Sequence, residues 1–262
     1  MALMTALITG ASAGIGRALA DGLAERGFRL VLTARDAARL EQAAGELRRR
    51  FGVEVSVVPQ DLSDPAGPEQ LVETLAARGL TVDILVNNAG LGAVERFAEG
   101  QIARQAAMLQ VNVVALTKLT RLLLPGMIAR SGGRILNVSS MAAYLPGPLM
   151  AVYYATKAYV SSFSEALSAE LEGSGVTVTA LCPGGTATEF QERAGMKRGG
   201  RYRRRSMTAE AVARVGIAAL LAGRRVAIPG WGNWFLYFLI RFSPRALVIR
   251  SVRLLNQSLL GR

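Results

Sequence analysis

The chain has 262 residues, of which 51% are hydrophobic and 19% are charged, with one cysteine and no histidine. This size suits one large α/β domain, and the apolar fraction excludes a disordered or collagen-like chain. One cysteine cannot form an internal disulfide, which fits a cytoplasmic setting. The lack of histidine excludes Ser-His and Cys-His nucleophile pairs and imidazole zinc sites. Acid/base chemistry therefore has to use Tyr, Lys, Asp or Glu, and we expect no metal.

The net charge of +12 is concentrated near the C-terminus, because the residues from Arg193 onward hold 15 Lys+Arg and one acidic residue, Glu210. This asymmetry indicates an anionic partner for that part of the chain. An anionic membrane surface or an acidic partner fits better than nucleic acid, since no recognition motif is present. The N-terminus lacks the features of a signal peptide, and the longest aromatic-aliphatic run, Trp234 to Ile240, is too short to span a bilayer. We therefore expect no transmembrane helix.

Short apolar runs alternate with segments of helical periodicity along most of the chain. The predicted strands are Thr5 to Thr9, Arg29 to Thr33, Val53 to Val58, Ile84 to Val86, Arg134 to Val138, Val176 to Leu181 and Arg225 to Ile228. The predicted helices are Ile15 to Arg26, Ala37 to Arg50, Pro68 to Arg78, Ile102 to Ala129, Val152 to Leu171, and a last one from an N-cap at Thr208 to Ala222. This alternation predicts a Rossmann-type, doubly wound parallel sheet in a single domain over residues 1–230. Glycines and arginines between Gly195 and Arg205 predict a mobile loop, within a substrate loop over 186–207.

The first strand runs into a glycine-rich turn, Thr9-Gly10-Ala11-Ser12-Ala13-Gly14-Ile15-Gly16, which opens the first helix. Glycines there let the chain turn tightly and let backbone N–H groups approach a pyrophosphate at the positive helix end. Such turns also occur for structural reasons alone. The position between the first strand and the first helix favours dinucleotide binding.

The second predicted strand ends in Thr33-Ala34-Arg35, where an NAD-binding fold usually places an acidic residue for the ribose 2′-hydroxyl. A small residue followed by arginine leaves room for a 2′-phosphate and supplies a cation for it. The sequence therefore favours NADP. The alternative is that Arg35 is a solvated surface residue.

Tyr153 and Lys157 are four residues apart on a predicted helix, so they share one face. A nearby ammonium lowers the pKa of a phenol, which is otherwise a poor proton carrier at neutral pH. Ser140 follows a predicted strand at the edge of the sheet where ligands bind, and its hydroxyl could hold a carbonyl oxygen. Taken singly, a surface Tyr-Lys pair and a loop serine remain alternatives.

Together these motifs, with Asn87-Asn88-Ala89-Gly90, Asn112 and Pro183-Gly184 through Thr188, resemble the short-chain dehydrogenase/reductase family in order and spacing over about Thr5 to Phe190. The resemblance implies that Tyr153 is the general acid/base, that Ser140 polarises the substrate oxygen, and that Lys157 binds the nicotinamide ribose. It implies that Asn112 connects Lys157 to a proton-relay water. The implied cofactor-binding residues are Gly10, Ser12, Ala13, Gly14, Ile15, Gly16, Arg35, Asp61, Leu62, Asn88, Ala89, Gly90, Tyr153, Lys157, Pro183, Gly184, Thr186 and Thr188. Tyr154 lacks the four-residue spacing to Lys157, so the proton is assigned to Tyr153.

The resulting expectation is an NADP-dependent oxidoreductase that interconverts a carbonyl and a secondary alcohol of an apolar substrate. The alternative is a non-catalytic NADP-binding regulator or a membrane-surface scaffold. By analogy with the family, the helices predicted at Ile102 to Ala129 and Val152 to Leu171 would pair in a homo-oligomer.

Residues 231–262 form a distinct extension in which Trp231 to Phe242 holds six of the 16 aromatic residues. From Pro244 onward, Val248, Val252, Leu255 and Leu259 recur at helical spacing, opposite several arginines, which predicts a basic amphipathic helix. This helix could lie in an anionic membrane interface. The apolar residues could instead cover the substrate pocket or form an interface between subunits.

Overall fold

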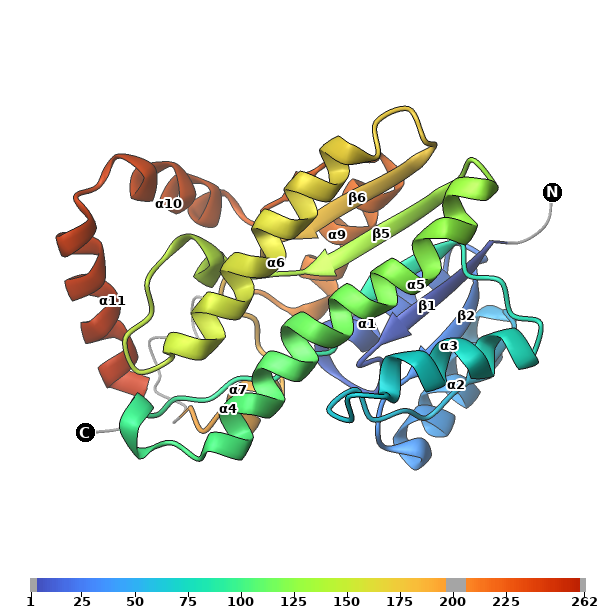
Figure 1. The fold of residues 1–262 in the computed structure, drawn as a ribbon, viewed down its shortest axis with the longest axis horizontal. Coiled ribbons are helices and arrows are strands. Elements are labelled where there is room, and N and C mark those ends of the chain that lie inside the picture. The colour runs from blue at the N-terminus through green and yellow to red at the C-terminus, as the bar shows by residue number, and fades with distance from the viewer. Residues whose placement is uncertain (1–3, 197–205, 260–262) are drawn as a thin grey trace.

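A computed structural model of the protein describes residues 4–196 and 206–259. Within these residues seven parallel strands form one sheet in the order β3-β2-β1-β4-β5-β6-β7 (Figure 1). The strands are β1 (Thr5–Thr9), β2 (Arg29–Thr33), β3 (Val55–Val57), β4 (Ile84–Asn87), β5 (Gly133–Val138), β6 (Val176–Leu181) and β7 (Val226–Ala227). The predicted doubly wound parallel sheet is confirmed.

Both faces of the sheet are buried, which explains the continuous apolar runs of the strands. Along β1, Ala6 and Ile8 point to one hydrophobic cluster, whereas Leu7 points to the other. Helices α1 (Gly14–Ala24), α2 (Ala37–Phe51) and α9 (Ala209–Leu221) cover the first face. Helices α3 (Gly67–Ala77), α5 (Leu116–Ala129) and α6 (Ala151–Glu170) cover the second, and α5 and α6 lie in front of the strands in Figure 1.

Most predicted elements lie within one or two residues of their observed ends, and the largest departure is in the helix predicted at Ile102 to Ala129. It consists of α4 (Ile102–Leu109), a π-helical segment η2 (Gln110–Ala115) and α5. The last predicted strand, Arg225 to Ile228, is shortened to the two residues of β7. The predicted N-cap is observed, because the Thr208 side chain accepts a hydrogen bond from the backbone N–H of Ala211.

The stretch Ile102–Ala129 is long and apolar enough to cross a membrane by length and composition alone. It is the one such candidate among the described residues, and it bears on our expectation of no transmembrane helix. Its packing is that of a domain helix, because Leu119 and Met127 are buried against the sheet. On its outer side, Lys118 pairs with Glu69 of α3.

Several elements beyond the regular pattern were not predicted. They are the 3-10 turns η1 (Phe97–Glu99) and η3 (Met141–Tyr144), the short helix α7 (Phe190–Arg193) and the helix α10 (Trp231–Phe242). The predicted amphipathic helix is α11 (Arg245–Leu259), and α10 and α11 stand at the edge of the molecule outside the sheet layers (Figure 1). Residues 197–205 of the predicted mobile loop lie outside the described residues. The described flanks of the loop meet in a bridge between Thr186 and Met207.

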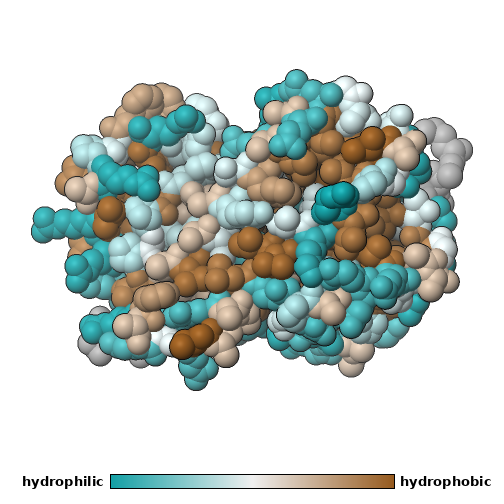
Figure 2. Space-filling model, viewed as in Figure 1, coloured by the Kyte–Doolittle hydropathy of each residue, from teal (hydrophilic) through white to brown (hydrophobic). Residues whose placement is uncertain are grey.

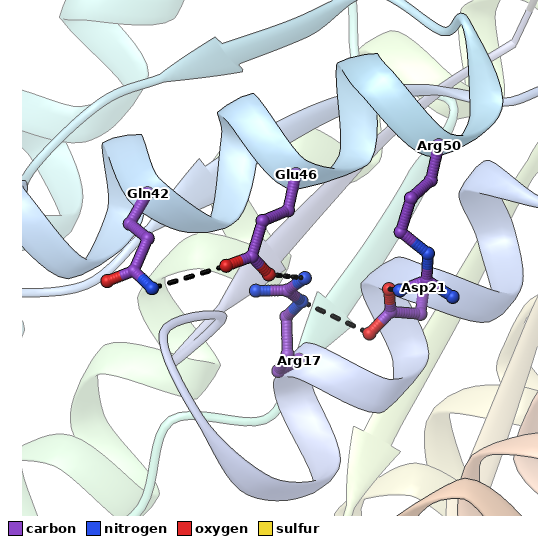
Figure 3. Close-up of polar contacts among 5 residues, drawn as sticks. All are labelled: Arg17, Asp21, Gln42, Glu46 and Arg50. Carbon is purple, nitrogen blue, oxygen red and sulfur yellow. Dashed lines mark hydrogen bonds and ion pairs between the residues drawn. The ribbon is translucent and has the colours of Figure 1, made fainter.

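A group of ion pairs joins α1, which follows the glycine-rich turn, to α2 (Figure 3). The Arg17 guanidinium lies between Asp21 of its own helix and Glu46 of α2, at 3.1 and 2.7 Å. Gln42 donates to Glu46, and Arg50 pairs with Asp21. These contacts fix the start of α1 relative to α2.

We expect Arg17→Gln to lower the free energy of unfolding by about 1 to 2 kcal/mol, because the Arg17 side chain is only 20% exposed and two carboxylates would lose their partner. Urea unfolding of the cofactor-free protein measures this change. The control Arg96→Gln removes an exposed pair with Glu99 and should change stability by less than about 0.5 kcal/mol. Equal effects of the two substitutions would contradict this role of Arg17.

Candidate active site

A cavity of about 970 Å³ opens at the carboxyl ends of the strands, where the order of the sheet reverses between β1 and β4. Almost all of the sequence-predicted site residues line it. These are Gly10, Ser12, Ala13, Gly14, Ile15, Arg35, Asp61, Leu62, Asn88, Ala89, Gly90, Ser140, Tyr153, Lys157, Pro183, Gly184, Thr186 and Thr188. Gly16 and Asn112 do not line the cavity, but they support residues that line it.

The turn after β1 requires glycine at three positions. Gly10 and Gly14 have φ angles of 65° and 58°, which L side chains rarely adopt. At Gly16 a Cβ atom would collide with the Gly10 carbonyl and the Asn88 amide. Helix α1 starts without a side-chain cap, so its first N–H groups are available to a ligand in the cavity.

Asn88 holds this turn onto the end of β4. Its side-chain amide donates to the carbonyls of Thr9 and Gly10, at 2.8 and 3.1 Å. The Thr9 hydroxyl in turn accepts from the backbone N–H groups of Asn88 and Ala89, both at 2.9 Å. Asn88 therefore shapes the cavity as a structural support, in addition to lining it.

The end of the cavity next to β2 is charged, with the carboxylates of Asp36, Asp61 and Glu189 beside two arginines. Arg35 and Arg39 both lie in its wall, and both are exposed. Arg39 pairs with Glu189 at 3.0 Å, across the cavity from α2. Beside them the buried Thr33 hydroxyl has no hydrogen-bond partner among the described residues. An open helix terminus, two guanidinium groups and an unused hydroxyl fit the adenosine and phosphates of a dinucleotide.

Asp61 lies in the same part of the cavity. Burial opposes its charge, but hydrogen bonds from the Ser63 hydroxyl and backbone N–H, with Arg35 nearby, hold the pKa of this carboxyl below its usual value. Asp61 is therefore an acceptor at neutral pH, as an adenine amino group requires.

Tyr153 and Lys157 project from the first half of α6 into the middle of the cavity. The Lys157 ammonium lies 5.9 Å from the centre of the Tyr153 ring and donates to the Val138 carbonyl at 2.7 Å. Burial lowers the pKa of Lys157 to about 8, because the charged form is separated from water. The Tyr153 ring packs against Phe190, with ring centres 5.5 Å apart.

Ser140 lies at the end of β5 as the N-cap of η3. Its hydroxyl oxygen accepts from the Ala142 backbone N–H at 3.1 Å and lies 3.5 Å from the Pro183 carbonyl. The second contact is long, so the hydroxyl proton is available to a ligand oxygen in the cavity.

Asn112 lies in the π-helical segment η2, a type of distortion often found at functional sites. Its amide donates to the Leu91 carbonyl and the Thr156 hydroxyl, and its oxygen accepts from the Leu91 backbone N–H, at 2.8 to 3.0 Å. Both donor hydrogens are thus used within the protein. Asn112 ties the loop after β4 to α6, one residue before Lys157, so its side chain has a positioning role in this structure.

The segment after β6 covers the glycine turn. A Cβ atom on Gly14 would lie 3.2 Å from the Thr188 side chain, so these two predicted residues are in close contact. Thr186 donates to the Gly184 carbonyl, and Gly184 itself packs closely on the Asn233 side chain of α10. Pro183 accepts from the Met141 backbone N–H.

The opposite end of the cavity is mostly apolar and is partly built by the C-terminal extension. Leu145, Met150, Met196, Leu236, Leu255 and Leu259 line it. Asn256 of α11 donates to the Pro148 carbonyl and accepts from the Tyr154 hydroxyl at 3.4 Å. Burial raises the pKa of Tyr154, and this contact directs its hydroxyl toward α11.

The sequence analysis missed several cavity residues, among them Arg39, Phe190 and Asn256. Arg39 had a visible signal, since it is a second arginine four residues after Arg35 in the sequence. Phe190 and Asn256 carry no local signal, because only the tertiary packing brings α7 and α11 to the cavity. In the described part of the chain, no group of three or more Asp, Glu or Cys residues could hold a metal ion.

Comparison with known proteins agrees with this geometry. The pattern of the family described as short chain dehydrogenase matches residues 4–199. A very-long-chain 3-oxoacyl-CoA reductase from Anas platyrhynchos is 38% identical over 193 residues, which cover 71% of this chain and 61% of that protein. The chain therefore spans about three fifths of the length of this curated relative.

Two solved structures with the same fold carry different cofactors. A short-chain dehydrogenase from Sphingobium yanoikuyae in complex with NADPH is 33% identical, with a TM-score of 0.82 over 91% of this chain and 94% of that one. A short chain dehydrogenase/reductase from Burkholderia phymatum in complex with NAD is 29% identical, with a TM-score of 0.80 over 90% and 92%. On these similarities, the chain belongs to the short-chain dehydrogenase family of nicotinamide-dependent oxidoreductases.

Proposed function

We propose that this protein is an NADP(H)-dependent oxidoreductase that interconverts a carbonyl group and a secondary alcohol on an apolar substrate. The observation that carries the proposal is the convergence of Ser140, Tyr153 and Lys157 in one cavity, between a charged end and an apolar end. A protein that only binds nucleotide needs the charged end but not a phenol and a hydroxyl beside it. The convergence therefore favours catalysis over a regulatory role.

The preference for NADP rests on the two arginines at the charged end of the cavity. Arg35 and Arg39 supply guanidinium groups there, and guanidinium binds phosphate in bidentate fashion. The related structure with NADPH supports this preference, whereas the one with NAD shows that the fold accepts either cofactor.

In the mechanism that we propose, the bound nicotinamide supplies hydride chemistry. Tyr153 donates its phenolic proton to the oxygen of the carbonyl group, and Ser140 donates a hydrogen bond that strengthens as charge develops on that oxygen. The Lys157 ammonium favours the ionised phenol and binds ribose hydroxyl groups. Asn112 and Thr156 hold the helix that carries both groups.

The apolar end of the cavity indicates the class of substrate. Methionine and leucine side chains, such as Met150 and Leu259, bind aliphatic or alicyclic surfaces without directional contacts. The relative that acts, by its name, on very-long-chain 3-oxoacyl-CoA supports an acyl-chain ketone. We therefore propose a ketone with a long apolar substituent.

The expected homo-oligomer and cytoplasmic location also remain proposals. Half-exposed apolar side chains on α4 to α6, including Val114, Leu122, Ile128 and Tyr159, support pairing through these helices. Figure 2 shows hydrophobic surface gathered over and between α5 and α6. Sedimentation of the purified protein determines whether it forms a dimer or tetramer.

Tyr153→Phe is expected to lower kcat at least about 100-fold, because it removes the proton donor and keeps the ring. Binding of NADPH should change little. The reaction is followed as NADPH oxidation with a panel of aliphatic, steroidal and 3-oxoacyl ketones. The matched control Tyr154→Phe, which loses only the contact to Asn256, should keep kcat within about tenfold. Unchanged turnover in Tyr153→Phe would reject the assignment.

Arg35→Ala is expected to weaken NADPH binding about 10 to 100-fold, because a charged hydrogen-bond partner of the 2′-phosphate is lost. Binding of NADH, which lacks this phosphate, should change less than about threefold. Fluorescence titration of both cofactors measures the ratio, with Arg96→Ala as a distant control. An equal loss for NADH and NADPH would contradict a role in cofactor choice.

NADPH binding is expected to weaken as the pH rises above about 8. In the cofactor-free protein the pKa of Lys157 is lowered to about 8, so above this pH the lysine is neutral and has to take up a proton to bind as a cation. Titration calorimetry at pH 9, in buffers of different ionisation enthalpy, should show uptake of up to one proton. At pH 7 the uptake should be close to zero, and Lys157→Met should show none at either pH.

A further inference from the structure

We propose that the outer face of α10 docks on an anionic membrane surface and places the apolar end of the cavity at the lipid. We call this face the aromatic face, and it consists of Trp231, Trp234, Phe235, Phe238 and Phe242. All five side chains are exposed, and Trp231 and Phe242 are 84% and 73% exposed. No residue of α10 is buried, although the helix has the composition of a hydrophobic core.

The two sides of α10 differ in their contacts. Asn233, Tyr237 and Ile240 recur at helical spacing and are the residues of this helix that are partly covered. The Tyr237 ring packs against Tyr144 at 4.6 Å, and Asn233 donates to the Pro229 carbonyl. The aromatic face points to the opposite side, so docking of α10 on the enzyme leaves this face free.

The rings of the aromatic face pack on one another along the helix. Their centres are 6.1 Å apart for Trp231 and Trp234, 6.2 Å for Trp234 and Phe238, and 4.9 Å for Phe238 and Phe242. A continuous ridge of large aromatic rings that ends in tryptophan is typical of segments that lie at the membrane-water interface.

Basic residues lie on α10 and on the helix that follows it. Arg241, Arg245, Arg250 and Arg253 are all exposed on α10 and α11. On α11, Arg250 lies between the exposed Leu247 and Leu254 at helical spacing, so apolar and basic groups share the outer side. The sequence contains no acidic residue after Glu210. This surface is complementary to anionic lipid headgroups.

The same charges disfavour a second copy of the chain as the occupant. In a symmetric dimer the same patch meets itself, so arginines of one copy would approach arginines of the other. Helices α10 and α11 carry no acidic residue that could neutralise them. Like charges in such a contact are costly, whereas a lipid surface supplies the missing negative charge.

The cavity reaches this surface at two leucines. Leu236 of α10 and Leu255 of α11 line the cavity and are 41% and 50% exposed, so both helices of this surface also form part of the cavity wall. An enzyme docked through α10 can receive a lipophilic ketone directly from the bilayer. This last step rests on the proposed function, whereas docking itself does not.

The chain offers a label-free test, because its two tryptophans, Trp231 and Trp234, both belong to the aromatic face. The full-length protein is mixed with vesicles of phosphatidylcholine alone, or of phosphatidylcholine with about 30 mol% of the anionic lipid phosphatidylserine. We expect flotation with the anionic vesicles, a blue shift of tryptophan emission, and quenching by lipids brominated near the headgroup. No flotation and no spectral change with anionic vesicles would overturn the proposal.

Two sets of substitutions assign the binding to this surface. Phe235→Ser with Phe238→Ser should lower the partition coefficient at least about tenfold, while Phe97→Ser with Ile102→Ser, which are even more exposed on η1 and α4, should not. The triple variant Arg245→Gln, Arg250→Gln and Arg253→Gln should also lower the partition coefficient. The loss should exceed that of a control with the same net charge, in which Arg49, Arg121 and Arg214 are replaced by Gln. Equal losses in the variant and control of either set would reject the assigned surface.

Self-association is the competing outcome. If the aromatic face joins two copies, the blue shift will follow protein concentration without lipid, and Phe235→Ser with Phe238→Ser will halve the mass measured by light scattering. That result contradicts membrane docking. Vesicle binding is measured without turnover, so an enzyme inactive on every ketone can still dock, and the two proposals fail separately.

Discussion

The site depends on the reversal of strand order between β1 and β4. On either side of this point the chain crosses to opposite faces of the sheet, so no connection covers the carboxyl ends of the two strands. The Thr9 hydroxyl and the Asn88 amide join these ends through four hydrogen bonds and hold the glycine turn in place. The other parts of the cavity are arranged around these hydrogen-bonded ends of β1 and β4.

Buried polar contacts connect β4 to the neighbouring elements and fix the position of α6, the helix that bears the candidate catalytic groups. Asn87 donates to Thr120 and Asn137, which link β4 to α5 and β5, and Asn112 reaches Thr156 on α6. Such groups are costly to bury unless they are paired, so each pair favours one arrangement of strands and helices. Within this framework Lys157 can stay buried, because the Val138 carbonyl accepts a hydrogen bond from its ammonium group.

The sequence predicts the sheet and most of the cavity, because both depend on local signals. A run such as Thr5 to Thr9 is buried on both faces, and glycine is required where Gly10 and Gly14 have positive φ angles. The π-helical turn at Asn112 was not predictable, since it accompanies a tertiary contact of that side chain with the loop at Leu91. In α11 the expected apolar stripe was partly wrong. Asn256 is buried where Tyr154 and Pro148 satisfy it, and Leu255 is half exposed.

The C-terminal extension shows why the same residues supported two interpretations. An apolar periodicity indicates that one face of a helix is removed from water, but it does not identify the protein surface or membrane that covers this face. In the structure the buried residues Asn256 and Leu259 line the apolar end of the cavity, whereas the outer side of α10 has no counterpart in the described chain. Covering the pocket and meeting a lipid surface therefore use different sides of one helical pair. Pocket closure and membrane docking are then linked physically, because a surface that binds the outer side of α10 and α11 also restrains the part of the cavity wall that these helices form.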